Sequence, residues 1–271
     1  MPELPEVETT RRGVAPHVEG HKVTAVRIYD HRLRWPVPPD LAKRLIGRKI
    51  DRVERRSKYL LFRIGPAALI IHLGMTGSLR VHKQVPERRL HDHVDFEFDN
   101  GVTLRYHDPR RFGAVLWAHG KISGHPLLAN LGPEPLSADF DADYLFAATR
   151  NRRTGIKAVI MDSQVVVGVG NIYANEALFR AGIRPTRSAN RISYARLQRL
   201  VEAIRETLTE AIAKGGSTLR DYVDSDGQPG DFQLGYYVYG RSGAACRTCA
   251  ASIRTLRSGG RATFYCATCQ R

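Results

Sequence analysis

The cysteines constrain the fold of this chain more than any other feature. All four lie near the C-terminus, as Cys246, Cys249, Cys266 and Cys269, in the spacing C-x2-C-x16-C-x2-C. Each C-x2-C pair can present two thiolates from one tight turn, and two such pairs can surround one Zn²⁺ ion as a zinc ribbon. Because four protein ligands complete the tetrahedral shell, we expect a structural zinc. Two disulfides are the alternative, although a reducing compartment disfavours them.

The charge of the chain indicates its class of partner. The sequence holds 42 Lys and Arg residues against 27 Asp and Glu, which gives a formal net charge of +15 and a pI near 10.0. Arginine dominates, and its guanidinium can bind a phosphate through two parallel hydrogen bonds. We expect nucleic acid as the partner, and a generally basic surface is the alternative.

Composition excludes several other classes of protein. A hydrophobic content of 42% is too high for a wholly disordered chain. No apolar run reaches the ~18 residues of a membrane span, and the charged N-terminus lacks the apolar core of a secretory signal. We therefore expect a cytoplasmic protein. Association with the nucleoid and a monomeric state are expected as well.

The first half of the chain is rich in short β-favouring runs. Val94, Phe96 and Phe98 alternate with acidic residues, which is typical of a strand with one buried face. Asn100-Gly101 then favours a tight hairpin to the next run. Strands do not alternate with helices, so we predict a β-sandwich flanked by helices rather than a parallel sheet. The runs expected as strands are 23–29, 59–64, 68–72, 94–98, 102–106 and 114–117.

A proline-rich segment around Pro133 and Pro135 separates this region from a helical one. Helices are predicted at 142–148, 154–161, 171–181 and 193–214. The fold class is therefore predicted to be α+β and multidomain. Its expected parts are a β-sandwich domain at 1–130, a hinge at 131–150, a helical domain at 151–238 and a zinc finger at 239–271.

The segment from Val165 to Asn171 contains Gly168 and Gly170, as a nucleotide-binding loop would. The dinucleotide fingerprint needs Gly or Ala where this chain has Tyr173, and no acidic residue stands near the ribose position, so that interpretation fails. The glycines could instead permit two tight turns between helices, with the amino end of the second helix holding a DNA phosphate. A plain connection between helices is the alternative.

The N-terminus could carry a reactive amine. Met1 is followed by Pro2 and Glu3, so removal of Met1 would leave a secondary amine beside a carboxylate. An α-amine titrates near ~7.7–8.0, well below the ~10.4 of lysine, so more of it is free base at neutral pH. Attack of this amine on a sugar C1′ gives an iminium, which is an electron sink for elimination. The same residues are also ordinary signals of a helix start.

Six motifs, in this order, resemble those of the bacterial formamidopyrimidine-DNA glycosylases (Fpg or MutM, of the Fpg/Nei family). They are Pro-Glu-Leu-Pro-Glu-Val-Glu-Thr from residue 2, Lys58, His-Leu-Gly-Met at 72–75, Asp-Pro-Arg-Arg-Phe-Gly at 108–113, Val-Gly-Val-Gly-Asn-Ile-Tyr at 167–173 and the cysteine module. The resemblance covers essentially the whole chain. It implies a catalytic sandwich domain and a helix-two-turn-helix module at 151–238. It also implies base-excision repair of damaged double-stranded DNA, by excision of 8-oxoguanine and formamidopyrimidines and β,δ-elimination at the abasic site.

The same resemblance assigns the catalytic roles. Pro2 is expected as the nucleophile and Glu3 as its general acid and base, while Glu6 shapes the hydrogen bonding around them. Lys58 is expected to contact the lesion nucleotide and assist proton transfer. Arg261, in the zinc finger, is expected to reach the flanking phosphates and aid δ-elimination.

Other residues match the family's DNA contacts. Met75, Arg110 and Phe112 match the side chains that fill the gap left by a flipped base, two as apolar wedges and the arginine as a partner of the orphaned cytosine. We call these three the wedge residues. Phosphate contacts are expected from His91, Arg110, Arg152, Lys157 and Asn171.

The resemblance also assigns a lesion-capping loop at 217–235. The residues expected around the flipped base are Ser217, Asp221, Tyr222 and Val223, the last three through backbone amides. Asp231 stands where the family commonly has an aromatic residue, a departure that bears on lesion preference.

Two other functions were weighed. The first is a zinc-containing DNA-binding protein without catalysis, in which Pro2-Glu3 is incidental. The second is the oxidised-pyrimidine specificity of the sister endonuclease VIII enzymes. Those open with Pro-Glu-Gly-Pro where this chain has Leu4 in place of the glycine, and the wedge residues also argue against them.

Overall fold

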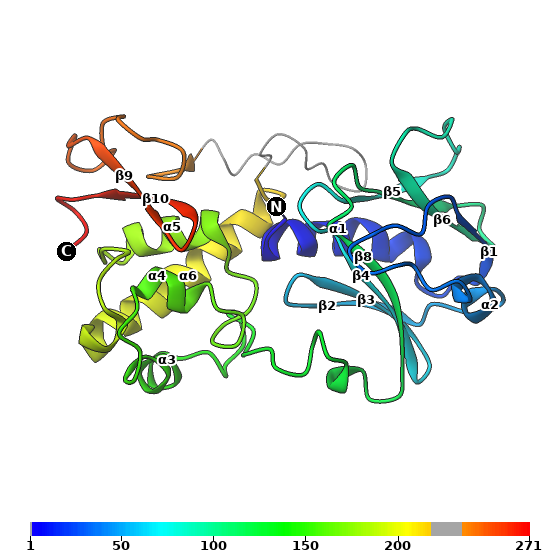
Figure 1. The fold of residues 1–271 in the computed structure, drawn as a ribbon, viewed down its shortest axis with the longest axis horizontal. Helices are drawn as coiled ribbons and strands as arrows, with labels where there is room; N and C mark the ends of the chain where they lie inside the picture. The colour runs from blue at the N-terminus through cyan, green and yellow to red at the C-terminus, as the bar shows by residue number, and fades with distance from the viewer. Residues whose placement is uncertain (1, 218–234) are drawn as a thin grey trace. The chain divides into compact units, whose positions relative to one another are not determined.

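The computed structural model describes residues 2–217 and 235–271 (Figure 1). The chain divides into two compact units. Unit 1 comprises Met1–Ala129 with Lys214–Asp231, and unit 2 comprises Asn130–Ala213 with Phe232–Arg271.

Unit 1 is built on two four-stranded antiparallel sheets. The first has the order β1-β6-β7-β5, at Val23–Ile28, Asp92–Phe98, Thr103–His107 and Ser78–His82. The second has the order β2-β3-β4-β8, at Arg52–Arg56, Tyr59–Ile64, Ala67–His72 and Ala114–His119. Three helices accompany them: α1 at Leu4–Val18, α2 at Leu41–Leu45 and the 3-10 turn η1 at Ile122–Gly124. The predicted β-sandwich flanked by helices is confirmed.

One hydrophobic core joins the sheets to α1. It includes Phe62 and Ile71 of one sheet, Phe96 and Leu104 of the other, and Val14 of α1, all buried. The period-two pattern of 94–98 places its apolar side in this core, as predicted. The tight hairpin is confirmed as well, since Gly101 has a φ of 80° and its N–H donates to the Phe98 carbonyl over 3.0 Å.

Four elements in the described part of unit 1 were not predicted: β2, β5, α2 and the 3-10 turn η1. The strand β2 has the sequence Arg-Val-Glu-Arg-Arg and lies at a sheet edge, where a single buried residue, Val53, packs inward. β5 is also an edge strand. α2 spans only five residues, which is too short for a helical period to show.

Unit 2 contains the predicted helices, with α3 at Ala142–Thr149, α4 at Ile156–Ile160, α5 at Asn171–Arg180 and α6 at Tyr194–Ala213. A 3-10 turn, η2, occupies Ala189–Arg191. α5 packs against α6 and against the C-terminal hairpin of β9 at Ile253–Ser258 and β10 at Arg261–Cys266. The helix-two-turn-helix module and the zinc-finger hairpin of the predicted fold are therefore both present.

The glycines before α5 serve different purposes. Gly168 has a φ of 79°, a conformation that suits glycine and permits a tight turn there. Gly170 is the N-cap of α5 with an extended φ of −112°, so it needs no such freedom. The expectation of positive-φ turns at both glycines is thus right only for Gly168.

None of the helices in the described part of the chain is long and apolar enough to cross a membrane.

Candidate active site and DNA-binding residues

The N-terminal turn of unit 1 buries two carboxylates beside Pro2. Pro2 is buried, and Glu3 and Glu6 are each 2% exposed. Glu3 is the N-cap of α1, and its own N–H donates to Glu6 Oε2 over 2.8 Å in a capping box. The helix start proposed for these residues is therefore real, and it holds both carboxylates next to the expected nucleophile.

Glu6 also connects this turn to a distant part of the sequence. Its Oε1 accepts hydrogen bonds from the Ser217 N–H over 2.8 Å and from the Ser217 hydroxyl over 3.2 Å. Gly216 has a φ of 81°, and a Cβ there would lie 3.0 Å from Glu6 Oε1. The start of the expected lesion-capping loop thus contacts the catalytic turn. The other expected loop residues, Asp221, Tyr222 and Val223, and the departure at Asp231, lie outside the described residues.

Lys58 lies in the turn between β2 and β3, next to Ser57 with its φ of 58°. Burial, together with the positive charges of Lys58 and Arg34, lowers the pKa of His72 to about 4. His72 is therefore neutral at pH 7, and its Nδ1 accepts the Gly74 N–H over 3.0 Å. The Lys58 ammonium therefore acts electrostatically on His72.

The wedge residues lie on two neighbouring turns of unit 1. Met75 follows β4, and Arg110 and Phe112 lie between β7 and β8. Met75 is 37% exposed and Phe112 is 44% exposed, which is unusual for large apolar side chains. The guanidinium carbon of Arg110 lies over the Phe112 ring, 4.9 Å from the ring centroid. All three line an open pocket of about 700 Å³ that Arg32, Arg34 and Arg111 also border.

Two of the three expected phosphate contacts of unit 2, Lys157 and Asn171, lie at the zinc-finger hairpin. Lys157 is 3% exposed, and its Nζ donates to the Ala262 carbonyl over 3.0 Å and to the Thr263 hydroxyl over 2.8 Å. The Asn171 amide donates to the same carbonyl over 3.1 Å. Ala262 directly follows Arg261, which is exposed at the start of β10. Lys157 and Asn171 therefore hold the backbone beside Arg261.

The two remaining expected phosphate contacts are Arg152, which has a protein partner, and His91, which has a strained backbone. Arg152 pairs with Asp162 over 2.9 Å at the surface of unit 2. His91, in unit 1, has a φ of 76°, and its buried Nδ1 has no hydrogen-bond partner among the described residues.

Sequence reasoning missed two buried polar residues on α5. Asn175 is fully buried, and its Oδ1 accepts the Phe264 N–H over 2.8 Å. Glu176 is 1% exposed and accepts the N–H groups of Tyr237, Val238 and Tyr239 over 2.8, 3.0 and 2.8 Å. The available signal was two adjacent polar residues within the otherwise apolar run of α5.

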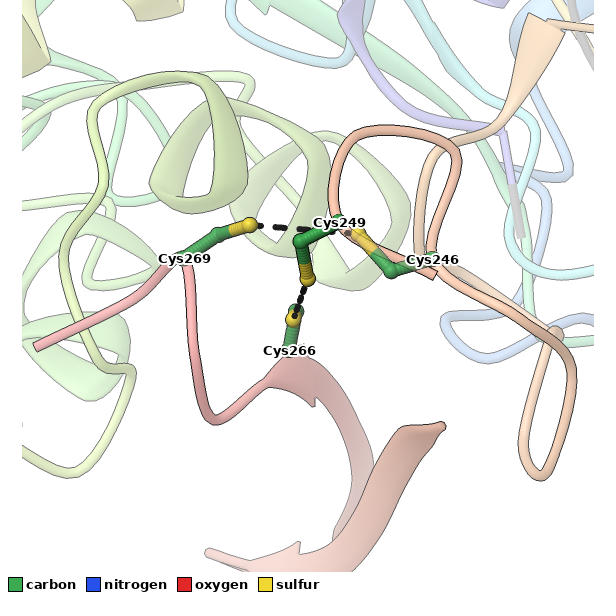
Figure 2. A group of neighbouring side chains, drawn as sticks. All are labelled: Cys246, Cys249, Cys266 and Cys269. Atoms are coloured by element: carbon green, nitrogen blue, oxygen red, sulfur yellow. Dashed lines mark hydrogen bonds between the residues drawn. The ribbon is translucent and has the colours of Figure 1, made fainter. Parts of the chain in front are cut away.

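The four cysteines form one metal site. Cys246 and Cys249 come from the loop before β9, Cys266 ends β10 and Cys269 follows it (Figure 2). All four sulfurs lie within 4.8 Å of one another, at 3.9 Å for Cys246–Cys269 and 3.4 Å for Cys249–Cys266. Tetrahedral Zn²⁺ with Zn–S bonds of ~2.3 Å places its sulfurs about 3.8 Å apart, so the set fits one structural zinc ion. The thiols are free, and the alternative of two disulfides is wrong.

Apart from the cysteines, the expected residues that the structure brings together form three groups. In unit 1, Glu6 bonds to Glu3, which follows Pro2, and to Ser217, while the wedge residues share one pocket of the same unit. Lys157, Asn171 and Arg261 meet at the hairpin of unit 2.

Three family models match the chain. The formamidopyrimidine-DNA glycosylase N-terminal domain matches residues 1–115, and the H2TH domain of the same enzymes matches residues 131–223. The zinc finger found in FPG and IleRS matches residues 243–271.

Characterised relatives are similar over their whole length. The formamidopyrimidine-DNA glycosylases of Thioalkalivibrio sulfidiphilus and Methylococcus capsulatus are 59% and 55% identical over 271 residues, which cover 100% of each chain. The crystal structure of the MutM (Fpg) protein from Thermus thermophilus has a TM-score of 0.89 at 42% identity, over 99% of this chain and 98% of that one.

Structures of the Lactococcus lactis Fpg protein hold damaged DNA. A mutant in complex with Fapy-dG-containing DNA has a TM-score of 0.92 at 34% identity, over 100% of both chains. Other complexes of that protein contain an abasic site or an oxidised pyrimidine. The fold, the zinc site and the full-length identity agree, and this chain belongs to the formamidopyrimidine-DNA glycosylase family.

Proposed function

We propose that this chain excises oxidised purines, 8-oxoguanine and formamidopyrimidines, from duplex DNA through a Schiff base on Pro2, and cleaves the abasic site by β,δ-elimination. Membership of the family makes the chain a DNA glycosylase and abasic-site lyase of base-excision repair. The observation that carries the finer proposal is the N-terminal turn, where two buried carboxylates, Glu3 and Glu6, follow Pro2 in the chain.

The first chemical step forms a bond from the Pro2 nitrogen to C1′ while the bond from C1′ to the base breaks. The base leaves with the electron pair of that bond and takes up a proton, for which Glu3 is the proposed acid. The Pro2 nitrogen then loses its proton, and its electron pair expels O4′, which takes up a proton. This opening of the sugar ring gives an iminium, a cation that needs no further protonation. Glu6 fixes this turn through its bond to the Glu3 N–H.

Elimination follows from the electron demand of the iminium. Loss of a C2′ proton expels the 3′ phosphate, and a second elimination expels the 5′ phosphate. Lys58 is proposed to contact the lesion nucleotide and assist these proton transfers. Arg261 is proposed to neutralise the departing phosphate, and the bonds of Lys157 and Asn171 to Ala262 support the hairpin that presents it.

DNA binding is proposed to use the charged groups of both units. Phosphate contacts are assigned to His91, Arg110, Arg152, Lys157 and Asn171. The net charge of +15 favours association with the nucleoid, and several phosphate contacts make affinity fall steeply with salt. The segment from Ser217 through Asp221, Tyr222 and Val223 is proposed to cap the flipped base, with its first residue held by Glu6.

Borohydride trapping tests the proposal directly. Reduction during reaction with a duplex containing 8-oxoguanine opposite cytosine should give a covalent protein–DNA adduct, provided that mass spectrometry confirms the loss of Met1. A matched protein that retains Met1 or carries an N-terminal tag should bind DNA but form no adduct. Full strand cleavage by the extended protein would exclude Pro2 as the nucleophile.

Oxidised-pyrimidine specificity is the second candidate, because a Lactococcus lactis Fpg complex contains an oxidised pyrimidine. Excision of thymine glycol should be compared with excision of 8-oxoguanine under the same single-turnover conditions. Faster removal of thymine glycol would overturn the purine assignment while leaving the Pro2 chemistry intact.

A further inference from the structure

Asp108 is a fully buried carboxylate that the proposed reaction does not use. It follows β7 and is 0% exposed. Its Oδ1 accepts the Thr76 hydroxyl over 2.7 Å, and its Oδ2 accepts the Gly113 N–H over 2.9 Å and the Tyr106 hydroxyl over 3.4 Å. One side chain therefore binds the turn that carries Met75 and the turn that carries Arg110 and Phe112.

Thr76 completes this connection. Its hydroxyl donates to Asp108 and accepts the Arg110 N–H over 3.3 Å. Thr76 directly follows Met75 in the chain. A single hydroxyl thus holds the backbone next to two of the three wedge residues.

The two turns also touch through their backbones. Gly74 has a φ of 64°, and a Cβ at that position would collide with the Gly113 nitrogen and the Phe112 carbonyl carbon. A Cβ on Gly113 would in turn collide with the His72 carbonyl oxygen and the Tyr106 hydroxyl. Close backbone packing of this kind leaves the turns little room to move independently.

A third DNA-binding segment is tied to the same aspartate. The Asp108 N–H donates to the His91 carbonyl over 3.1 Å. The Asp108 carbonyl oxygen lies 2.8 Å from His93 Nε2. Asp108 thereby connects the expected phosphate ligand His91 to both turns that bear the wedge.

We propose that Asp108 and Thr76 are positioning residues, which hold Met75, Arg110 and Phe112 as one preformed wedge for entry into the base stack. This inference rests on the proposed function. Neither residue touches DNA in the proposed role. Their contribution is to order the wedge before binding, so that less conformational freedom is lost when the wedge enters the duplex.

Selectivity for the opposite base is the property that should depend most on this arrangement. Arg110 must reach the orphaned base at a defined angle to favour cytosine, whose pairing edge presents two adjacent acceptors, O2 and N3, over adenine, whose pairing edge presents one acceptor, N1, beside an amino donor. If the Arg110 backbone moves freely, the guanidinium can adapt to either base. Loosening the turns should therefore lower the ratio of excision opposite cytosine to excision opposite adenine while the protein stays folded.

Thr76→Val tests the role of the hydroxyl. Valine has nearly the same shape but leaves Asp108 Oδ1 and the Arg110 N–H without that partner. Single-turnover excision of 8-oxoguanine opposite cytosine, divided by excision opposite adenine, should fall by at least about fivefold. Thr76→Ser retains the hydroxyl and should stay within about twofold of wild type. Thr24→Val, an exposed threonine of β1, is the matched control and should change neither rate.

A ratio that is unchanged in Thr76→Val, or that falls equally in Thr76→Ser, would overturn the inference. Asp108→Asn, which disturbs both carboxylate oxygens, should reduce the ratio further in protein whose fluorescence from Trp35 and Trp117 remains native. Equal loss opposite both bases would indicate a purely structural role and would also count against it.

Wedge insertion can be measured without catalysis. The fluorescence of 2-aminopurine placed opposite an abasic-site analogue should rise on binding of wild type, and should rise less with Thr76→Val. A wild-type protein that unstacks this base but forms no borohydride adduct would refute the proposed reaction alone. Equal unstacking by wild type and Thr76→Val would refute the positioning role alone.

Discussion

Glu176→Gln should detach the zinc finger from α5 while leaving unit 1 unaffected. The carboxylate of Glu176 is buried and accepts three successive backbone N–H groups, from Tyr237, Val238 and Tyr239. These residues begin the segment that leads to Cys246. Glutamine has the same size, so the change alters hydrogen bonding and charge without creating a cavity.

The magnitude follows from which bonds a glutamine can keep. Oε1 accepts two of the N–H groups and Oε2 accepts the third. In its best orientation the glutamine oxygen retains the pair, and its NH₂ group faces the Tyr237 N–H. One charge-assisted bond worth about 1.5–3 kcal/mol is lost, and the two remaining bonds weaken to neutral ones, for a total of roughly 3 kcal/mol. With a urea m-value of about 2 kcal/mol/M, the midpoint should fall by about 1.5 M.

Two signals separate the units in one titration. Both tryptophans, Trp35 and Trp117, belong to unit 1, so their fluorescence follows that unit. Zinc release, followed with a chromogenic chelator, reports the finger. Only the zinc-release midpoint should fall in Glu176→Gln, and neither should move in the control Glu202→Gln, an exposed change on α6. A zinc-release midpoint within about 0.3 M of wild type would show that the three hydrogen bonds do not support the finger.

Two further predictions concern protons and metal. The pKa of His72 in the folded protein, about 4, lies below its ordinary 6.5, so the unfolded chain gains a proton that the folded chain lacks as pH falls. The contribution of neutral His72 to the free energy of unfolding is therefore complete above pH 6.5 and is lost towards pH 4, with about 2 kcal/mol lost by pH 5. The free energy of unfolding measured in urea should depend less on pH over this window in His72→Asn than in wild type. Removal of zinc should unfold the finger and weaken binding to damaged duplex, measured by fluorescence anisotropy, and undiminished affinity after confirmed metal loss would contradict this role of the metal.

The strands that the sequence predicted share one property, which is an apolar face buried in the core. Val94, Phe96 and Phe98 share one face of their strand, and these apolar side chains must be buried in the core. The strand and its hairpin were therefore predictable. β2 has only Val53 to bury and is paired on one side, so its β structure comes from its neighbour β3 rather than from its own pattern. Edge strands of this kind are specified by tertiary context.

The zinc site was predictable in full because its ligands are contained in a short local pattern. The partners of the buried polar residues were not, because most of them are backbone groups or lie far away in the sequence. Glu6 accepts the distant Ser217 N–H, and Asp108 accepts the nearby Gly113 N–H and the distant Thr76 hydroxyl. Backbone N–H groups occur at almost every position, so the sequence marks the acceptor but not its donor.

Lys157 shows the same limit from the donor side. The family resemblance assigns this lysine to a phosphate, and the sequence does not show which protein groups its ammonium binds. An ammonium needs only acceptors, however, and at 3% exposure it must find them within the protein. Here they are the Ala262 carbonyl and the Thr263 hydroxyl, next to Arg261. Lys157 therefore binds the β9–β10 hairpin, Glu176 binds the segment that leads to the finger, and the zinc ligands connect the two. Loss of any of the three should act on the reaction through the placement of Arg261.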